Sequence, residues 1–335
     1  MRRRSTALVA GAVALTGLVV GVTLDRVDDG DEASSAPAGD PCASTAPLVA
    51  VAGNDSAGEG GAEITVVRPD GTRAVATGGW VATDPDIAPD HERMVVSRAL
   101  GDWESAGPEA TALWTLGLDG SDRRRVTDDV PEVYDSAPAW SPDGATIAFV
   151  RSTHPGSGIL TVPVAGGEAQ EVVPPEAEVE VDGPEWSPDG SRLAFVRRRL
   201  NVTGQPGDAE LWTVAADGSG ASSVGRVDLR ATKVDWHPDG SRVLVSAYGD
   251  GEGTLVLVDL ASGSTTPIAR DSTFGRWSRT GTHVVHYTRV GATEEREWRL
   301  VESPVTGTAL GDARDLGVTD FLYRYFSVAV AGCPP

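Results

Sequence analysis

One short motif recurs along this chain and limits what the chain can fold into. Copies follow one another in the sequence: PAWSPDG (138–144), PEWSPDG (184–190), VDWHPDG (234–240) and the degraded GRWSRTG (275–281). An earlier segment, PDIAPDH (85–91), has Ile87 where the other copies have Trp. From Ile87 onward the Trp positions are spaced by 53, 46, 50 and 41 residues. Recurrence at this spacing predicts repeated structural units rather than one irregular core.

Each copy of the motif has the chemistry of a β-hairpin. Proline presets φ, aspartate bonds its own backbone, and glycine accepts a positive φ, so Pro-Asp-Gly forms a tight turn. An apolar strand follows each turn, at 93–97, 146–150, 192–196, 242–246 and 282–287. A second hairpin is expected after each first one, at 112–127, 158–173, 210–225, 254–269 and 297–310. Every unit therefore contains four strands.

The two ends of the chain supply the strands of one more unit. Residues 47–53 and 62–78 predict three strands, and residues 319–332 predict one or two. Together they complete a sixth unit, and each unit then has roughly 48 residues, the length of a propeller blade. We therefore expect an all-β fold, a six-bladed β-propeller of four-stranded blades. Its ring would be closed by N- and C-terminal strands, which removes free sheet edges.

The motif also resembles a known family. Trp-Ser-Pro-Asp-Gly followed by an apolar strand is similar to the WD40-like repeat of TolB-type six-bladed β-propellers. The resemblance rests on Trp140–Gly144, Trp186–Gly190 and Trp236–Gly240, with degraded copies at Ile87–His91 and Trp277–Gly281, and covers residues 47–335. It implies the fold and not the Tol-Pal role. Related propellers are attached to prolyl peptidases and lyases, but this sequence has no G-x-S-x-G nucleophile motif.

An N-terminal apolar segment precedes the repeats. Arg2–Arg4 are followed by 18 uncharged residues, Ala7–Leu24, which as a helix would reach roughly 27 Å, close to the thickness of a bilayer. The flanking charges place the rest of the chain outside the cytoplasm. We expect residues 1–24 to be a signal-anchor or signal peptide, so the protein is either membrane-anchored or secreted. Residues 25–46 read as a flexible acidic linker before the propeller at 47–335.

Charge and cysteine content add two constraints. The formal net charge of −21 argues against a nucleic-acid partner, because phosphate contacts need a cationic face. Cys42 and Cys333, the two cysteines, stand just before and at the end of the repeats. In an oxidising compartment they would form a disulfide that locks the ring; the alternative is two separate thiols.

The loops opposite the Pro-Asp-Gly turns differ in length and content, and variable loops on a rigid frame commonly carry binding. The alternative is that these side chains are solvated, and that Arg197–Arg199 pair with neighbouring carboxylates. The candidate binding residues on this loop face are Trp103, His154, Arg198, Arg199, Tyr248 and Arg289.

A second candidate site is the central channel. The residues one before the Trp position lie on innermost strands and point away from the Trp. They include Asp86, Glu185, Asp235 and Arg276. These side chains could attract a cation or a substrate; the alternative is ordinary pairing at the channel wall.

The pattern favours a non-catalytic binding module. The five histidines do not cluster, no metal-ligand motif is present, and we expect no metal and no cofactor. The expected partner is an extracytoplasmic protein, peptide or glycan, bound by a monomer. The alternative is a hydrolase or lyase acting on carbohydrate or a small ester, with its site in the channel.

Overall fold

A computed structural model describes residues 48–54, 62–68, 70–101, 109–154, 156–200, 206–227, 230–249, 252–290, 297–318 and 328–331. The chain divides into two compact units, Met1–Gly39 and Asp40–Pro335, and all described residues belong to the second. They form β-strands and no helix, which confirms the all-β prediction. The expected membrane segment, Ala7–Leu24, lies outside them; within the described ranges no helix is long and apolar enough to span a bilayer.

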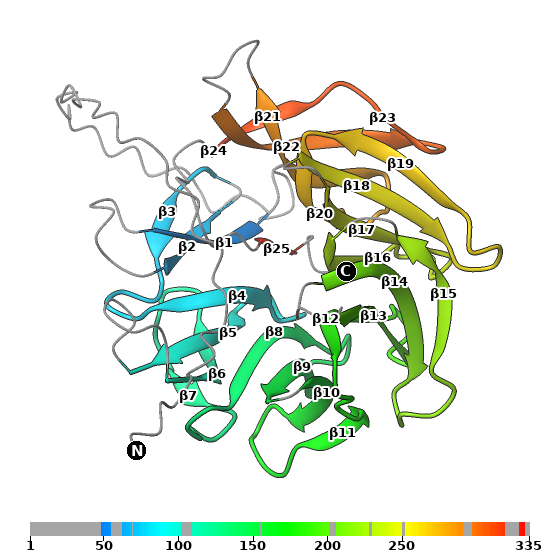
Figure 1. Ribbon diagram of the computed structural model, residues 1–335. Coiled ribbons are helices and arrows are strands. Elements are labelled where there is room, and N and C mark those ends of the chain that lie inside the picture. Colours follow the sequence, from blue (N-terminus) through cyan, green and yellow to red (C-terminus); the bar gives the residue numbers. More distant parts are fainter. Residues whose placement is uncertain are drawn as a thin grey trace, which may run out of the picture. The chain divides into compact units, whose positions relative to one another are not determined.

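The first sheet joins the first and the last strand of the described chain (Figure 1). Its strands, in spatial order, are β25 (Val328–Ala331), β1 (Leu48–Asn54), β2 (Ala62–Val67) and β3 (Arg73–Val75). All neighbours are antiparallel, and Val49 of β1 is paired with Val330 of β25. The prediction that N- and C-terminal strands share a sheet is confirmed, and this pairing covers the edge of β1.

Two further sets of strands follow and are joined along one hydrogen-bonded path. The first set is β4 (Ala82–Ile87), β5 (Arg93–Leu100), β6 (Ala110–Gly117) and β7 (Arg124–Arg125). The second set is β8 (Tyr134–Trp140), β9 (Thr146–Thr153), β10 (Gly156–Pro163) and β11 (Gln170–Val173). Within each set the strands are antiparallel neighbours, and the parallel link between β6 and β8 is the single pair Thr111–Tyr134.

Three more sheets complete the described chain. One contains β12 (Val179–Trp186), β13 (Arg192–Leu200), β14 (Pro206–Ala215) and β15 (Ser222–Val227). The next contains β16 (Arg230–Trp236), β17 (Arg242–Gly249), β18 (Glu252–Asp259) and β19 (Thr265–Arg270). The last contains β20 (Ser272–Trp277), β21 (His283–Val290), β22 (Glu297–Thr306), β23 (Ala309–Leu310) and β24 (Arg314–Val318).

The last sheet differs from the expected hairpin at 297–310. That hairpin exists, but β23 pairs with only two residues at the end of β22. The longer outer strand is β24, which pairs with Leu300–Glu302 in the middle of β22. The reason is local. After the tight turn at Gly307 the chain leaves the sheet, and it returns to the sheet as β24, a second segment that contains both apolar and polar residues.

The turns that carry the repeated motif are uniform. Five residues separate β4 from β5, β8 from β9, β12 from β13, β16 from β17 and β20 from β21. In each turn the first residue donates its backbone N–H to the carbonyl of the first residue after the turn, as Ser187 does to Arg192 at 2.8 Å. Gly144, Gly190, Gly240 and Gly281 all have φ between 68° and 72°, where glycine is the favoured residue. His91 adopts φ 58° in the copy that lacks glycine.

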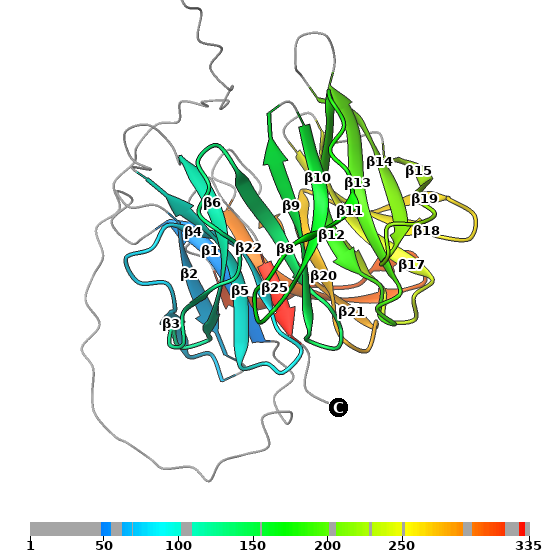
Figure 2. The ribbon, with the colours of Figure 1, turned by 90° about the horizontal axis from the view of Figure 1, so that it is seen from below.

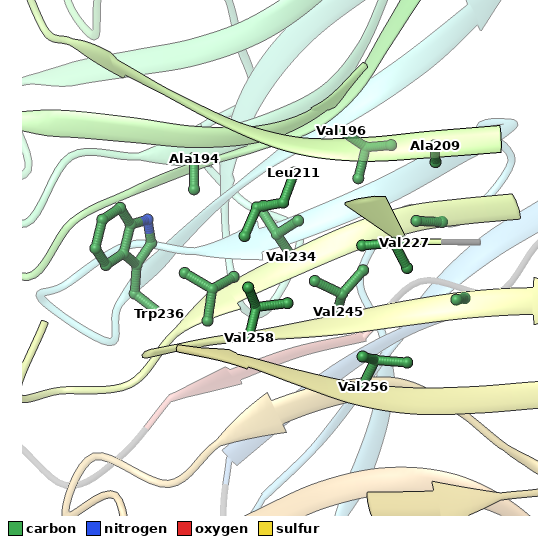
Figure 3. Close-up of a cluster of buried hydrophobic side chains, with 13 residues drawn as sticks. Ala194, Val196, Ala209, Leu211, Val227, Val234, Trp236, Val245, Val256 and Val258 are labelled. Atoms are coloured by element: carbon green, nitrogen blue, oxygen red, sulfur yellow. The ribbon is translucent and has the colours of Figure 1, made fainter. Parts of the chain in front are cut away.

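The innermost strands contact one another in a closed sequence: β4, β8, β12, β16, β20, β25 and again β4. Figure 2 shows the sheets edge-on, with neighbouring sheets packed face to face. The apolar strands after each turn are buried on both faces because a sheet lies on either side, as in β9, where Ile147–Val150 are at most 3% exposed. Figure 3 shows one such layer, in which Leu211 and Val196 meet Val234, Val245 and Trp236 between two sheets.

The motif tryptophans lie between sheets, as the repeat predicts. Trp140, Trp186, Trp236 and Trp277 are all buried. The indole N–H of Trp186 donates to the Ala139 carbonyl at 3.2 Å, and that of Trp236 donates to the Glu185 carbonyl at 3.1 Å. Each of these bonds links a sheet to the one before it in the chain.

Candidate functional site at the centre of the ring

Every innermost strand of the motif-bearing sheets has the same irregularity. The pairing of β4, β8, β12, β16 and β20 with their partners shifts by one residue within the segment that lies one to five positions before the Trp position. In four of them the third residue before that position has a positive φ: Asp84 (50°), Ala137 (47°), Gly183 (55°) and Phe274 (53°). A β-bulge of this kind bends the strand and redirects its side chains, and bulges are frequent near functional sites.

Charged side chains gather where these strands meet. We call this cluster the ring centre; it consists of Asp84 and Asp86 on β4, Asp182 and Glu185 on β12, Lys233 and Asp235 on β16, Arg276 on β20, and Arg198 on β13. All four candidate channel residues are members.

Arg276 is the hub of the ring centre. One of its terminal nitrogens, Nη1, lies 2.7 Å from Glu185 Oε2 and 3.0 Å from Asp235 Oδ1. The three side chains come from three different sheets and are only 13–17% exposed. Because charge-assisted bonds strengthen where water is scarce, this contact holds β12, β16 and β20 together.

Two aspartates of the ring centre also bind the backbone of the following sheet. Asp86 Oδ2 accepts the backbone N–H of Trp140 at 2.7 Å, and Asp235 Oδ2 accepts that of Trp277 at 2.5 Å. Burial, and after it the charge of Glu185, raises the pKa of Asp86 to about 7. Burial raises the pKa of Asp235 to about 7 as well, against the opposing charge of Arg276.

Four members of the ring centre were not predicted as channel residues. Lys233 Nζ lies 3.0 Å from Asp84 Oδ1, and Arg198 donates to Glu180, to the Ala231 carbonyl and to Asp182. Burial raises the pKa of Asp182. Asp84 and Lys233 occupy the same place in the repeat, three residues before the Trp position, so the repeat contained a signal that pointed to them.

The candidate loop-face residues have different surroundings. Trp103 and the side chain of Tyr248, on β17, lie outside what the structure describes, and His154 is exposed. Arg198 belongs to the ring centre, whereas Arg199 is ion-paired with Glu176 at 3.0 Å. The Arg289 guanidinium lies over the Trp298 ring at 5.5 Å from its centroid. With Arg197 also bound to Glu176, the Arg197–Arg199 triplet pairs with carboxylates, as the simpler interpretation expected.

Two other kinds of site were considered from the sequence, a metal site and a disulfide. No group of three His, Cys, Asp or Glu in the described part of the chain is arranged to hold a metal ion. Cys42 and Cys333 lie outside that part, so the expected disulfide stays a prediction.

Radially arranged sets of antiparallel strands whose innermost strands contact one another in a closed sequence define a β-propeller. No protein-family model matches the sequence, and no curated protein matches it. Solved structures do match. TolB from Acinetobacter baumannii gives a TM-score of 0.62 at 16% identity, covering 86% of this chain and 67% of that one. The fold is thus that of a TolB-like β-propeller.

Other matching structures show how widely this fold is used. A chain of the nidogen/laminin complex gives a TM-score of 0.59 at 11% identity, covering 86% of this chain and 100% of that one. An oligogalacturonate lyase in complex with manganese gives 0.52 at 14% identity, covering 73% and 68%. At these identities the likeness concerns the fold alone.

Proposed function

We propose that this protein is an extracytoplasmic six-bladed β-propeller that works as a non-catalytic binding module for a protein, peptide or glycan. Residues 7–24 would anchor it in the membrane; a secreted form, after cleavage, is the alternative. Acinetobacter TolB and a chain of the nidogen/laminin complex have the same fold, and the second of these propellers is part of a complex between proteins.

The observation that carries the proposal is the contrast between the two ends of the strands. At the end with the motif turns, the connection has five residues in all five units. At the other end, the corresponding connections have nine, two, five, two and six residues, from β5–β6 to β21–β22. A frame with constant turns at one end and unlike loops at the other presents its variable surface on a rigid support, which is how binding surfaces are commonly built.

The ring centre supports this proposal through its contacts. Arg276 is shared by two carboxylates, Lys233 is paired with Asp84, and Asp86 and Asp235 accept backbone N–H groups. These bonds run between sheets, so their first effect is to hold the frame together.

One observation favours the alternative function. Carboxyl groups whose pKa is moved to about 7 are found more often at catalytic sites than elsewhere. A hydrolase or lyase acting on carbohydrate or a small ester would use Asp86 or Asp235 as its acid or base. Turnover of such a substrate by the parent, lost in Asp86→Asn or Asp235→Asn, would replace the binding proposal with this one.

The binding proposal is tested with the full chain expressed in its host and cross-linked before purification. The test variant changes Trp103, His154 and Arg199 to Ala; of these, Arg199 is 67% exposed. The matched control changes Asp189 and Asp217 to Asn in turns at the other end, where the amide oxygen can still accept the turn hydrogen bonds. A partner retained by the control and lost by the test variant supports the proposal. A partner retained by both, or lost by both folded variants, contradicts the loop-face site.

A further inference from the structure

The ring centre contains more carboxylates than cations. Among the described residues, five carboxyl groups face one another there, Asp84, Asp86, Asp182, Glu185 and Asp235, together with three cations, Arg198, Lys233 and Arg276. Glu180, which also binds Arg198 but is 42% exposed, stands outside this count. The other two strands of the closed sequence add no charge to the position before the Trp: β8 has Ala139 there, and β25, Val328–Ala331, has no ionisable residue. Full ionisation would therefore leave two negative charges in a confined place.

The geometry concentrates that surplus at two groups. Lys233 is paired with Asp84, and Arg198 with Glu180 and Asp182, so Arg276 is the cation of the described residues that faces all three remaining carboxyl groups. Lys233 also acts on Asp86, but more weakly than Arg276 does. Arg276 Nη1 is within 3.0 Å of both Glu185 and Asp235, and the charge of Glu185 acts on Asp86. One cation balances one of these three groups; the other two are most easily balanced by protons.

We propose that the ring centre is a proton-linked lock between blades, in which Asp86 and Asp235 hold protons in the compact ring and release them in mildly alkaline solution, loosening the contacts between β4, β12, β16 and β20. Protonated, each aspartate still has a carbonyl oxygen that accepts the N–H of Trp140 or Trp277. Ionised, both repel Glu185 across the single guanidinium of Arg276.

The sign of the effect follows from linkage. The pKa of each aspartate is about 7 in the folded chain, above the ordinary 3.8. Protonation therefore favours the folded chain, and the stability it contributes is complete below about pH 4 and is lost as the pH rises through 7. His286 and His91 act in the opposite direction, because burial lowers the pKa of both, that of His286 to about 4, and the stability they contribute is present above pH 6.5. Between pH 6.5 and 8.5, therefore, the change in stability comes from the two aspartates and not from buried histidine.

The first test is the unfolding temperature of the full chain across this window. The parent should lose several degrees between pH 6.5 and 8.5. Asp86→Asn and Asp235→Asn, which keep an acceptor oxygen for the tryptophan N–H, should each lose about half as much, and the double variant almost nothing. The control is Asp189→Asn, which removes a carboxyl group at an exposed turn. Because the pKa of Asp189 is about 2, the unfolding temperature of this variant should change with pH as that of the parent does. A parent curve that is flat or rising, or Asn variants as steep as the parent, would overturn the lock.

A second measurement needs no variant. At pH 7 the folded ring centre holds protons that the unfolded chain cannot, so unfolding should release protons to the buffer. Calorimetry in two buffers of different ionisation enthalpy counts them, and the expected result is a net release approaching one proton per chain. Net uptake of protons on unfolding, or no change in bound protons, would contradict the proposal even if the variants fail to fold.

Discussion

The repeated tryptophans allow one prediction to be worked out with an internal control. Trp140 and Trp236 occupy the same place in the repeat and are 4% and 5% exposed. An arginine side chain lies over each ring, Arg93 at 5.3 Å and Arg192 at 5.1 Å from the centroid. The two tryptophans differ in one hydrogen bond. The indole N–H of Trp236 donates to the backbone carbonyl of Glu185, whereas that of Trp140 has no hydrogen-bond partner among the described residues.

Replacing either tryptophan by phenylalanine removes the same atoms and leaves the same gap, so the packing cost is shared. Trp236→Phe also breaks a hydrogen bond whose net contribution is about 1 kcal/mol. Trp140→Phe instead removes a buried donor without a partner, which relieves a cost of about 1 kcal/mol or more. The free energy of unfolding should therefore fall by about 2 kcal/mol more in Trp236→Phe than in Trp140→Phe.

Urea unfolding of the two variants and the parent, followed by far-ultraviolet circular dichroism, measures this difference. Trp186→Phe should behave like Trp236→Phe, because its indole donates to Ala139. Trp277→Phe should behave like Trp140→Phe, because the Trp277 indole nitrogen also lacks a partner in the described part of the chain. If all four variants agree within about 0.5 kcal/mol, the limit at which such differences are resolved, the indole hydrogen bonds do not stabilise the blade interfaces.

Three further predictions concern the turns and bulges. Gly240→Ala should cost about 1 kcal/mol in unfolding free energy, because φ is +72° but no atom lies within 4 Å of the new methyl group. Gly183→Ala should cost roughly 2 kcal/mol more, since φ is +55° and its methyl group would lie 2.7 Å from the Thr232 carbonyl oxygen in the next blade; equal costs in urea unfolding would contradict that contact. Asp189→Asn should flatten the loss of stability in acid, because hydrogen bonds from Ser187 and Ser191 lower the pKa of Asp189 to about 2, below the ordinary 3.8. The stability it contributes is therefore present above pH 3.8 and lost as the pH falls through 2, and thermal unfolding between pH 5 and pH 2 measures it.

Much of the fold was predictable because its information is local. Pro-Asp-Gly specifies its turn through the backbone preferences of three adjacent residues, and each observed turn has the same five-residue length. The apolar runs after the turns are buried strands, as at Ile147–Val150. The pairing of β1 with β25 was predictable by counting strands, because a ring of four-stranded units left three strands at one end of the chain and at least one at the other.

The ring centre was only partly predictable. The position before the Trp was correctly placed on the innermost strands, which identified Asp86, Glu185, Asp235 and Arg276. The bulge was missed, because a one-residue shift of register depends on how neighbouring sheets pack, and its residues Asp84, Ala137 and Phe274 are not glycines. Arg198 was expected on the loop face, but strand β13 continues as far as Leu200 and directs this side chain to Asp182 and the Ala231 carbonyl.

The sequence by itself determined the repeat, the turns, the strand order of every motif-bearing sheet except the last, and the tryptophans between the sheets. These features follow from short-range chemistry and from a pattern that is repeated several times. Only the tertiary structure decided which charges meet. Lys233 pairs with Asp84, 149 residues away, and Arg276 with Glu185, 91 residues away. Such pairs arise when blades distant in the chain turn their innermost strands toward one centre, and both the sharing of one arginine by two carboxylates and the raised pKa of Asp86 and Asp235 follow from that convergence.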